Sequence, residues 1–369
     1  MAGIMALLKF LLILLLLLQL PFLYSVCQSR QLSSYLAEVP RKDVEPTPFR
    51  DLRGAVHVHS AAGGHSLGTY PEIIESAKQA GFHYIFLTEH PRESSPFVQV
   101  SDPDLVVIYG IEEEREDAGR TLRNENSEVR ILAYLDGLTV PDDVTGLEVF
   151  NMFESAKEAQ NTFAWINWIY HQFTYEDLFF FHMLELDDSR FRTWDRTSSR
   201  RHLAGVGGND AHQNLGLTLQ TTSGDRLFGI QVDPYLLSFR FLTNHLFVPE
   251  TAKLTQETVL DALRKGSSYI AFERIADPTG FSFHAEWENQ AFSMGEDVPV
   301  GSHLVVQSPL PSLFRVIHMG RVYEELEGRQ FVLRAEEPGT YRVEVYPVAP
   351  PSLLRDTPWI ISNPIYVTP

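Results

Sequence analysis

The stretch Gly54-Ala55-Val56-His57-Val58-His59-Ser60 combines a short apolar strand with two histidines near its end. Residues two apart in a strand point to the same face, so His57 and His59 are expected to lie side by side. A lone buried histidine is more often a core residue held by one hydrogen bond than a ligand. Two histidines in register at a strand end favour a functional site.

The same arrangement returns along the chain: a short apolar run, a polar or histidine-rich end, then a helix-like stretch. Apolar residues at positions 73, 74, 77 and 80 predict an amphipathic helix over residues 70–80. A last helix is expected near 255–265, and residues 152–200 are expected to be mainly helical. Strands are expected over residues 54–59, 82–88, 105–111, 129–135, 147–150 and 203–206. This alternation predicts an α/β fold with a mainly parallel sheet or barrel, whose functional groups gather at the carboxyl ends of the strands.

The pattern of apolar and polar residues changes after about residue 276. Short alternating runs such as Tyr341-Arg342-Val343-Glu344-Val345 are separated by turn signals, among them Pro338-Gly339. This spacing predicts a C-terminal β-sandwich. The expected organisation is an N-terminal address over residues 1–27, a linker over 28–50, a barrel domain over 51–275 and a sandwich domain over 276–369.

The N-terminus has the pattern of an export signal. Lys9 is followed by an almost unbroken apolar run from Phe10 to Leu23, typical of a charged start and a secretory core. The run is just short of a comfortable membrane span, so an uncleaved anchor is an alternative. Cys27 follows where bacterial lipoproteins carry a lipidated cysteine, and ordinary cleavage near residues 25–29 is a third interpretation. All three export the rest of the chain, to the periplasm or to the outer face of a membrane.

Composition excludes several classes of protein. The 369 residues carry 30 Lys+Arg against 48 Asp+Glu, a formal net charge of −18. That balance argues against binding to long stretches of nucleic acid, which needs a basic surface. It leaves room for a small phosphorylated substrate whose charge is offset by metal ions. A single cysteine excludes an intrachain disulfide and a zinc site built from cysteines.

Histidines and acids follow four separate strands. Besides the first histidine pair, the strand ends carry Glu89 and His90, then Gly110-Ile111-Glu112, then Asn209-Asp210-Ala211-His212. Imidazoles and carboxylates without thiolates suit Zn²⁺, Mn²⁺ or Fe²⁺. Four histidines, two glutamates and one aspartate are more ligands than one ion needs, so two or three divalent ions are expected.

These motifs, in this order, resemble those of the polymerase and histidinol phosphatase (PHP) superfamily of metal-dependent phosphoesterases. The resemblance continues through Glu148-Val149-Phe150-Asn151, Asp233-Pro234-Tyr235 and the terminal Trp359–Tyr366 segment, and so covers nearly the whole exported part. It is closest to the exported branch with a C-terminal β-sandwich. It implies a distorted (β/α)7 barrel with a di- or trinuclear metal site at the carboxyl ends of the strands. The metal ligands that it implies are His57, His59, Glu89, His90, Glu112, Asp210 and His212.

The chain departs from the family pattern at several places. Glu89 stands where the family usually has an aspartate, which keeps the carboxylate but lengthens the side chain. His65 aligns with the family's aspartate after the first motif, and is expected to act as an acid beside the ligands or as a substitute ligand. Arg130 stands where many members have a histidine, and is expected to hold a phosphate oxygen rather than a metal.

The predicted activity is hydrolysis of a small phosphate ester by metal-activated water. Two other classes of function fit the same residues. A metal-dependent hydrolase of an amide or lactone would use the same ligand set. A non-catalytic, metal-stabilised binding or cell-envelope protein would bind metal without turnover. The sequence identifies neither the substrate nor the oligomeric state.

Overall fold

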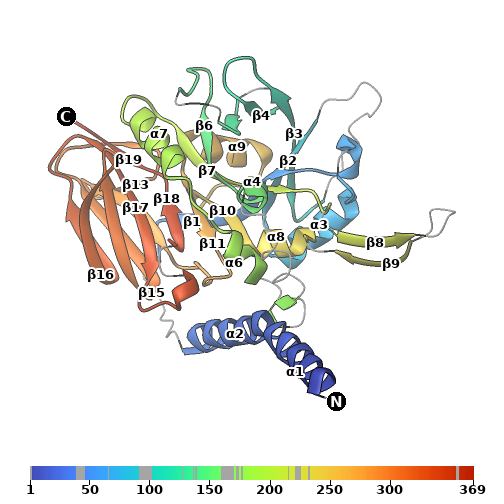
Figure 1. Ribbon diagram of the computed structural model, residues 1–369. Coiled ribbons are helices and arrows are strands. Elements are labelled where there is room, and N and C mark those ends of the chain that lie inside the picture. The colour runs from blue at the N-terminus through green and yellow to red at the C-terminus, as the bar shows by residue number, and fades with distance from the viewer. Residues whose placement is uncertain are drawn as a thin grey trace. The chain divides into compact units, whose positions relative to one another are not determined.

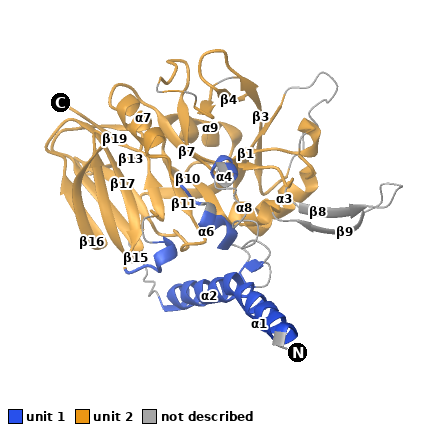
Figure 2. Ribbon diagram, in the orientation of Figure 1, with its two compact units in different colours: residues 1–39, 154–185, 349–356 blue, residues 40–153, 186–348, 357–369 orange. Residues whose placement is uncertain are grey.

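The computed structural model describes residues 2–38, 46–64, 66–90, 102–126, 128–135, 137, 139–158, 170–171, 174–175, 178–214, 216–220, 226–231, 233–354 and 357–369. Contacts divide the chain into two compact units (Figure 2). Unit 1 comprises residues 1–39, 154–185 and 349–356, and unit 2 comprises residues 40–153, 186–348 and 357–369. The predicted boundary between residues 275 and 276 stays a prediction.

Seven strands of unit 2 close into a ring (Figure 1). They are β1 (Phe49–Val58), β2 (Tyr84–Glu89), β3 (Val106–Glu114), β4 (Arg120–Asn124), β5 (Arg130–Ala133), β6 (Gly146–Asn151) and β7 (Ala204–Ala211). Neighbours pair in chain order, and β7 pairs back with β1. The two pairs that involve β4 are antiparallel, and the others are parallel. The mainly parallel barrel is therefore confirmed, although β4 was not predicted.

The helices of unit 2 begin and end close to residues that favour the start or the end of a helix. They are α3 (Tyr70–Gln79), α7 (Asp188–Ser198), α8 (Tyr235–Phe241), α9 (Gln256–Lys265) and the short 3-10 helix η1 (Ala61–Gly63). Helix α4 (Met152–Glu158) crosses the boundary between the units. At α9, the Thr255 side chain accepts a hydrogen bond from the Thr258 amide, and Gly266 ends the helix at φ 74°. The helices predicted over 70–80 and 255–265 are confirmed.

Strands β2, β6 and β7 are buried at every position, as expected for parallel strands covered on both faces. On β2, Tyr84 and Phe86 belong to one core cluster, which also contains the apolar face of α9. The alternate residues Ile85 and Leu87 belong to a second cluster under α3 and α8. This alternation fixes the register of β2, because a slip by one residue would exchange its two faces.

The rest of unit 2 is built mostly of strands. They are β8 (Gly216–Gln220), β9 (Arg226–Gln231), β10 (Leu242–Pro249), β11 (Ser268–Phe272), β12 (Ser282–Trp287), β13 (Gln290–Ser293), β14 (Asp297–Pro299), β15 (His303–His318), β16 (Arg321–Arg334), β17 (Gly339–Pro347), β18 (Ile360–Ser362) and β19 (Ile365–Thr368). The described residues after 276 form strands, turns and loops except for the 3-10 helix η2 (Ser352–Leu354), which belongs to unit 1. Strand β18 pairs with β11, so the end of the chain returns to the sheet that extends from the barrel. The sandwich arrangement stays a prediction.

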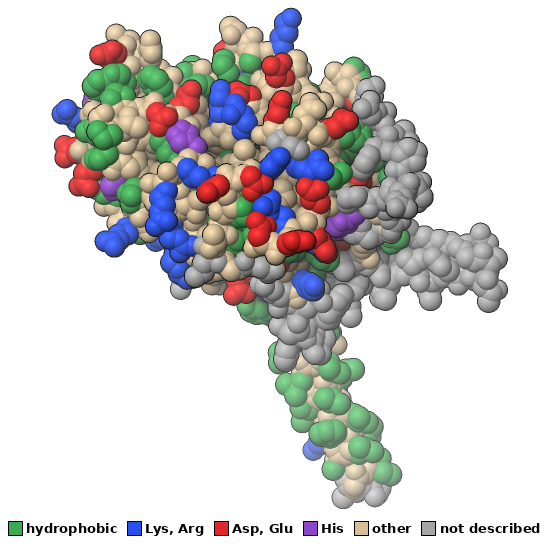
Figure 3. Space-filling model, turned by 90° about the horizontal axis from the view of Figure 1, so that it is seen from above, with side chains coloured by type: hydrophobic (Ala, Val, Ile, Leu, Met, Phe, Trp, Pro, Cys, Tyr) green, Lys and Arg blue, Asp and Glu red, His purple; other side chains and the backbone are tan. Residues whose placement is uncertain are grey.

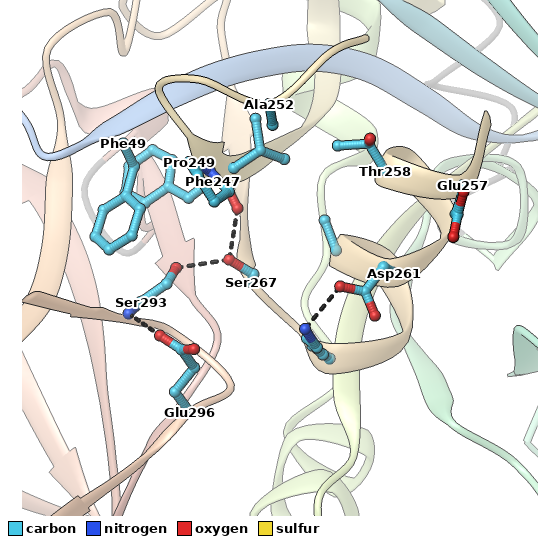
Figure 4. Close-up of a pocket in the computed structure, with 13 residues that line it drawn as sticks. Phe49, Phe247, Pro249, Ala252, Glu257, Thr258, Asp261, Ser267, Ser293 and Glu296 are labelled. Atoms are coloured by element: carbon cyan, nitrogen blue, oxygen red, sulfur yellow. Dashed lines mark hydrogen bonds and ion pairs between the residues drawn. The ribbon is translucent and has the colours of Figure 1, made fainter. Parts of the chain in front are cut away.

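A cavity of about 360 Å³ lies where β10, α9 and β13 meet (Figure 4). The rings of Phe49 and Phe247 stack along one wall, 5.9 Å apart. Ser267 donates to the Phe247 carbonyl at 2.7 Å and hydrogen-bonds Ser293 at 2.6 Å. None of the histidines and acids predicted as metal ligands lines this cavity.

Unit 1 contains the N-terminal helices α1 (Ala2–Leu17) and α2 (Leu20–Glu38), and the short α6 (Leu178–Met183). The segment from residue 3 to residue 38 is long and apolar enough to cross a membrane. Hydrophobic side chains cover the surface of the N-terminal helix in Figure 3. The Tyr170 hydroxyl donates to the Leu18 carbonyl at 2.7 Å, and Ser25 hydrogen-bonds Thr174 at 2.9 Å.

Candidate metal centre

The carboxyl ends of β1, β2, β3 and β7 bring the predicted residues to one rim of the barrel. These strands run parallel and are neighbours in the ring, so their last residues meet at the same edge. Glu89 ends β2 and Glu112 lies near the end of β3, while Asp210 lies at the end of β7. Two compact groups of His57, His59 and Glu112 and of His59, Asp210 and His212 lie at this rim.

His57 lies in a break of the strand rather than in regular alternation. Its backbone has φ 66°, and the pairing of β1 with both β2 and β7 shifts between Val56 and Val58. Asp210, across the β1–β7 pair, also has a positive φ of 46°. Positive φ at residues other than glycine costs free energy and concentrates at functional sites. The β-bulge, rather than the two-residue alternation of a regular strand, points the His57 side chain toward the carboxylates of Glu112 and Asp210. The His59 side chain faces the same two carboxylates.

Glu112 stands at the middle of three imidazoles. Its Oε2 atom lies 3.4 Å from His57 Nε2, 3.3 Å from His59 Nε2 and 3.2 Å from His90 Nε2. Glu112, His57 and His59 are almost completely buried, whereas His90 is partly exposed. One carboxylate oxygen thus faces three ring nitrogens that belong to two strand ends.

Asp210 forms a second centre that shares the same histidines. Its Oδ1 atom lies 3.3 Å from both His57 Nε2 and His59 Nε2. Nδ1 of His212 donates to the Asp210 carbonyl at 2.7 Å, which orients the His212 ring. Ligand atoms of His57, His59 and Glu112 form one compact group, and those of His59, Asp210 and His212 form another, each within 4.8 Å.

These separations fit divalent cations. Atoms that bind one ion tetrahedrally at about 2.1 Å lie about 3.4 Å apart, close to the distances observed between the imidazoles and the carboxylates. Asp210 Oδ1 is buried, and within the described part of the chain it accepts no hydrogen bond. A buried carboxylate oxygen whose near neighbours are imidazole nitrogens suits a ligand of a metal ion.

Neighbours to which the sequence analysis assigned no role hold the ligands in place. Glu148 is fully buried and lies 2.7 Å from His57 Nδ1, opposite the nitrogen that faces Glu112. The Asn151 amide donates to Glu148 at 2.9 Å and to Asp210 at 3.2 Å. The Tyr134 hydroxyl also donates to Asp210. Carboxylates that bond the second nitrogen of a ligating histidine fix its tautomer and orientation.

Glycine is required beneath Glu148. A Cβ atom at Gly208 would lie 1.6 Å from Glu148 Oε1, so any larger residue would displace the carboxylate from His57. Position 151 ends the strand that carries Glu148, and both belong to the Glu148-Val149-Phe150-Asn151 motif of the sequence. That motif was the available signal for Glu148, whereas nothing local marks Tyr134.

Burial and charge act in opposite directions on the ionisable groups. Burial lowers the pKa of His57, but Asp210 and Glu148 outweigh it and raise that pKa well above its usual value. Burial raises the pKa of Glu112, but hydrogen bonds from His57 and His59 hold it well below its usual range. Both shifts favour a pair of imidazolium and carboxylate. Metal binding must displace these protons, so metal affinity is expected to rise with pH.

The remaining predicted residues are placed as follows. Glu89 accepts hydrogen bonds from Ser60, at 3.0 Å from its amide and 2.5 Å from its hydroxyl, and is in neither compact group. His65 lies outside the described residues. Arg130 begins β5 and pairs with Asp143 at 2.9 Å. The structure does not bring Arg130 to the histidines, and its phosphate-holding role stays a prediction.

Replacing Glu148 with glutamine is expected to lower zinc affinity about 10- to 100-fold, because the amide keeps the shape but loses the charge that orients His57. Competition with a chromophoric chelator would measure the affinity. The matched control is Glu113→Gln, which removes a carboxylate on β3 that pairs with Arg123 at 2.7 Å. Equal zinc affinities of the two variants would contradict a supporting role for Glu148.

No protein-family model and no curated protein sequence matches the chain. Among solved structures, it is similar to a two-domain protein from Bacteroides vulgatus that contains a predicted PHP-like metal-dependent phosphoesterase. The two share 13% sequence identity with a TM-score of 0.38, over 89% of this chain and 98% of that one. The chemistry proposed below therefore rests on the residues of this chain.

Proposed function

We propose that the protein is a metal-dependent phosphoesterase that holds two or three divalent ions, Zn²⁺, Mn²⁺ or Fe²⁺. The observation that carries this proposal is the pair of carboxylate oxygens, Glu112 Oε2 and Asp210 Oδ1, each 3.3–3.4 Å from the same two imidazole nitrogens of His57 and His59. Nitrogen and carboxylate donors without thiolates suit these ions. His90 and His212 complete the proposed shell, and Glu89 is a further proposed ligand.

The chain's own residues prepare the site for this chemistry. Divalent ions held there would supply Lewis acidity, which lowers the pKa of water and offsets the charge of a phosphate ester. Glu148 orients His57, while Asn151 and Tyr134 hold Asp210 by hydrogen bonds. Burial of the ligands keeps bulk water from competing for them and strengthens the electrostatic interactions at the rim.

The test uses the full chain purified in detergent. Metal content is measured first, then hydrolysis of an aryl phosphate and an aryl phosphodiester with added Mn²⁺ or Zn²⁺. At least one equivalent of metal, with turnover that a chelator abolishes, is the expected result. Less than one equivalent of metal would reject the metal centre. Bound metal without turnover of either ester would reject the phosphoesterase and favour a binding protein.

We propose further that the protein is exported and stays attached to a membrane through its N-terminus. The apolar helix of unit 1 supports this proposal, as do the bonds that Leu18 and Ser25 make to residues 170 and 174. Cleavage near residues 25–29 would cut within α2 and remove the Leu18 contact. Intact N-terminal peptide in the washed membrane fraction is expected, and recovery of a shortened chain in the soluble fraction would reject retention.

A further inference from the structure

Arg120 reaches the rim of histidines and acids through a hydrogen bond to Glu112. It begins β4, opposite Glu114 of β3 and Ala133 of β5 in the strand register. Its Nη1 atom donates to Glu112 Oε1 at 2.9 Å, while Oε2 of the same carboxylate faces the three imidazoles. The guanidinium is therefore one carboxylate away from the proposed metal ligands.

Two contacts fix the guanidinium in place. Besides the bond to Glu112, the group lies over the ring of Tyr134, 5.3 Å from its centroid. The hydroxyl of that tyrosine donates to Asp210. Arg120 is thus tied to both carboxylates of the centre, to one directly and to the other through an aromatic ring. A cation held in this way needs little reorganisation to bind an anion.

Most of the donors of Arg120 make no hydrogen bond to the described residues. A guanidinium has five N–H donors, and within the described residues one hydrogen bond to Glu112 uses one of them. The approach of Nη2 to Glu114 is 3.8 Å, beyond hydrogen-bond length, and Glu114 is exposed. The Arg120 side chain is 37% exposed, so its remaining donors are accessible from solvent.

The neighbouring arginines are engaged elsewhere. Arg115 makes paired bonds to Asp117 and Asp143 at 2.7–3.1 Å. Arg123, three residues along the same strand, pairs with Glu113 at 2.7 Å. These pairs neutralise the charges of the two arginines locally. Arg120 is placed differently, since its partner is itself a buried member of the centre.

We propose that Arg120 binds a non-bridging oxygen of the substrate's phosphoryl group, beside the metal centre. This inference rests on the proposed function and deepens it, because it makes a tetrahedral phosphate anion the group that the site recognises. A planar guanidinium can bond two phosphate oxygens at once, and these charge-assisted bonds are stronger than neutral ones. A neutral ester or lactone would offer no anionic oxygen to the donors of Arg120 that Glu112 does not use.

The test measures binding of inorganic phosphate to the zinc-loaded full chain by calorimetry. Arg120→Gln is expected to weaken phosphate binding about 10- to 100-fold, since it removes a charge-assisted donor pair. Arg120→Lys keeps the charge but loses the paired N–H donors of the guanidinium. Its phosphate affinity is expected to lie between those of Arg120→Gln and the wild type. Arg123→Gln, on the same strand, is the matched control and is expected to bind phosphate as the wild type does.

Zinc affinity of each variant is measured in parallel. Unchanged zinc affinity with weaker phosphate binding supports the inference. Phosphate binding by Arg120→Gln as tight as that of the wild type would overturn the inference. A loss of zinc affinity as large as the loss of phosphate affinity would also overturn it, because Arg120 would then only position Glu112. The wild-type chain separates the two proposals, because phosphate binding without ester turnover rejects the phosphoesterase and leaves the role of Arg120 intact.

Discussion

Replacing Asp210 with asparagine is expected to remove most of the bound metal and to lower phosphate-ester turnover by about 10³-fold or more. Loss of a metal contact removes several kcal/mol of transition-state stabilisation, and each 1.36 kcal/mol is a factor of ten in rate. Asp210 Oδ1 faces the imidazoles of His57 and His59 at 3.3 Å, and a neutral amide in its place is a much weaker ligand. Metal analysis and steady-state kinetics would measure the two effects.

Asparagine is the informative substitution because it leaves the fold intact. It tolerates the positive φ of position 210 better than alanine, and its oxygen can still accept the Tyr134 hydroxyl. Circular dichroism should therefore match the wild type. Asp261→Asn on α9, where the carboxylate pairs with Lys265 at 2.7 Å, is the control and should keep metal and turnover. Full metal content in the Asp210 variant would refute the proposed centre.

Deprotonation of a single residue, His245 of β10, is expected to lower the free energy of unfolding by roughly 3 kcal/mol between pH 6 and pH 9.5. Each unit of pKa shift corresponds to about 1.36 kcal/mol. Burial lowers the pKa of this histidine, but Asp51 and Glu273 outweigh it and raise the pKa to about 9. Its ring nitrogens lie 2.9 Å from Asp51 and 3.0 Å from Glu273, so the protonated ring donates to both.

The direction of this effect follows from the raised pKa. In the unfolded chain the imidazole titrates near 6.5, so the extra stability is complete below that pH. It is lost as the pH rises through about 9, where the folded protein releases the proton as well. Denaturant unfolding at several pH values would measure the slope for the wild type and for His245→Gln. The variant lacks the titrating group, and an identical slope in both proteins would rule out His245 as its source.

Local pattern was enough to predict the strands that carry the proposed ligands. The apolar runs that end in His57 and His59, in Glu89 and in Glu112 became β1, β2 and β3; β2 is buried on both faces, and β1 and β3 are buried at least in part. Strand β4 has no such signal. Its sequence, Arg120-Thr121-Leu122-Arg123-Asn124, contains one apolar residue, and its antiparallel partners on both sides make it a strand.

The arginines show where prediction from sequence stops. Arg130 was expected to hold phosphate because it stands where many family members have a histidine; it begins β5 and pairs with Asp143, and its role stays a prediction. Arg120 reaches Glu112 because β3 and β4 pair in a register that sets Glu114 against Arg120. That register depends on the turn between the strands and on closure of the barrel. Neither of these produces a periodic pattern of apolar residues in the sequence.

The sequence by itself determined which residues end the parallel strands, and hence that histidines and acids meet at one rim of a barrel, because burial of strands and helices leaves a periodic pattern of apolar residues. Only the tertiary structure decided how these side chains are aimed. The bulge at His57, the positive φ of Asp210 and the contacts of Glu148, Tyr134 and Arg120 join residues far apart in the chain. Such contacts are set by the register and closure of the whole barrel, and no local stretch of sequence encodes them.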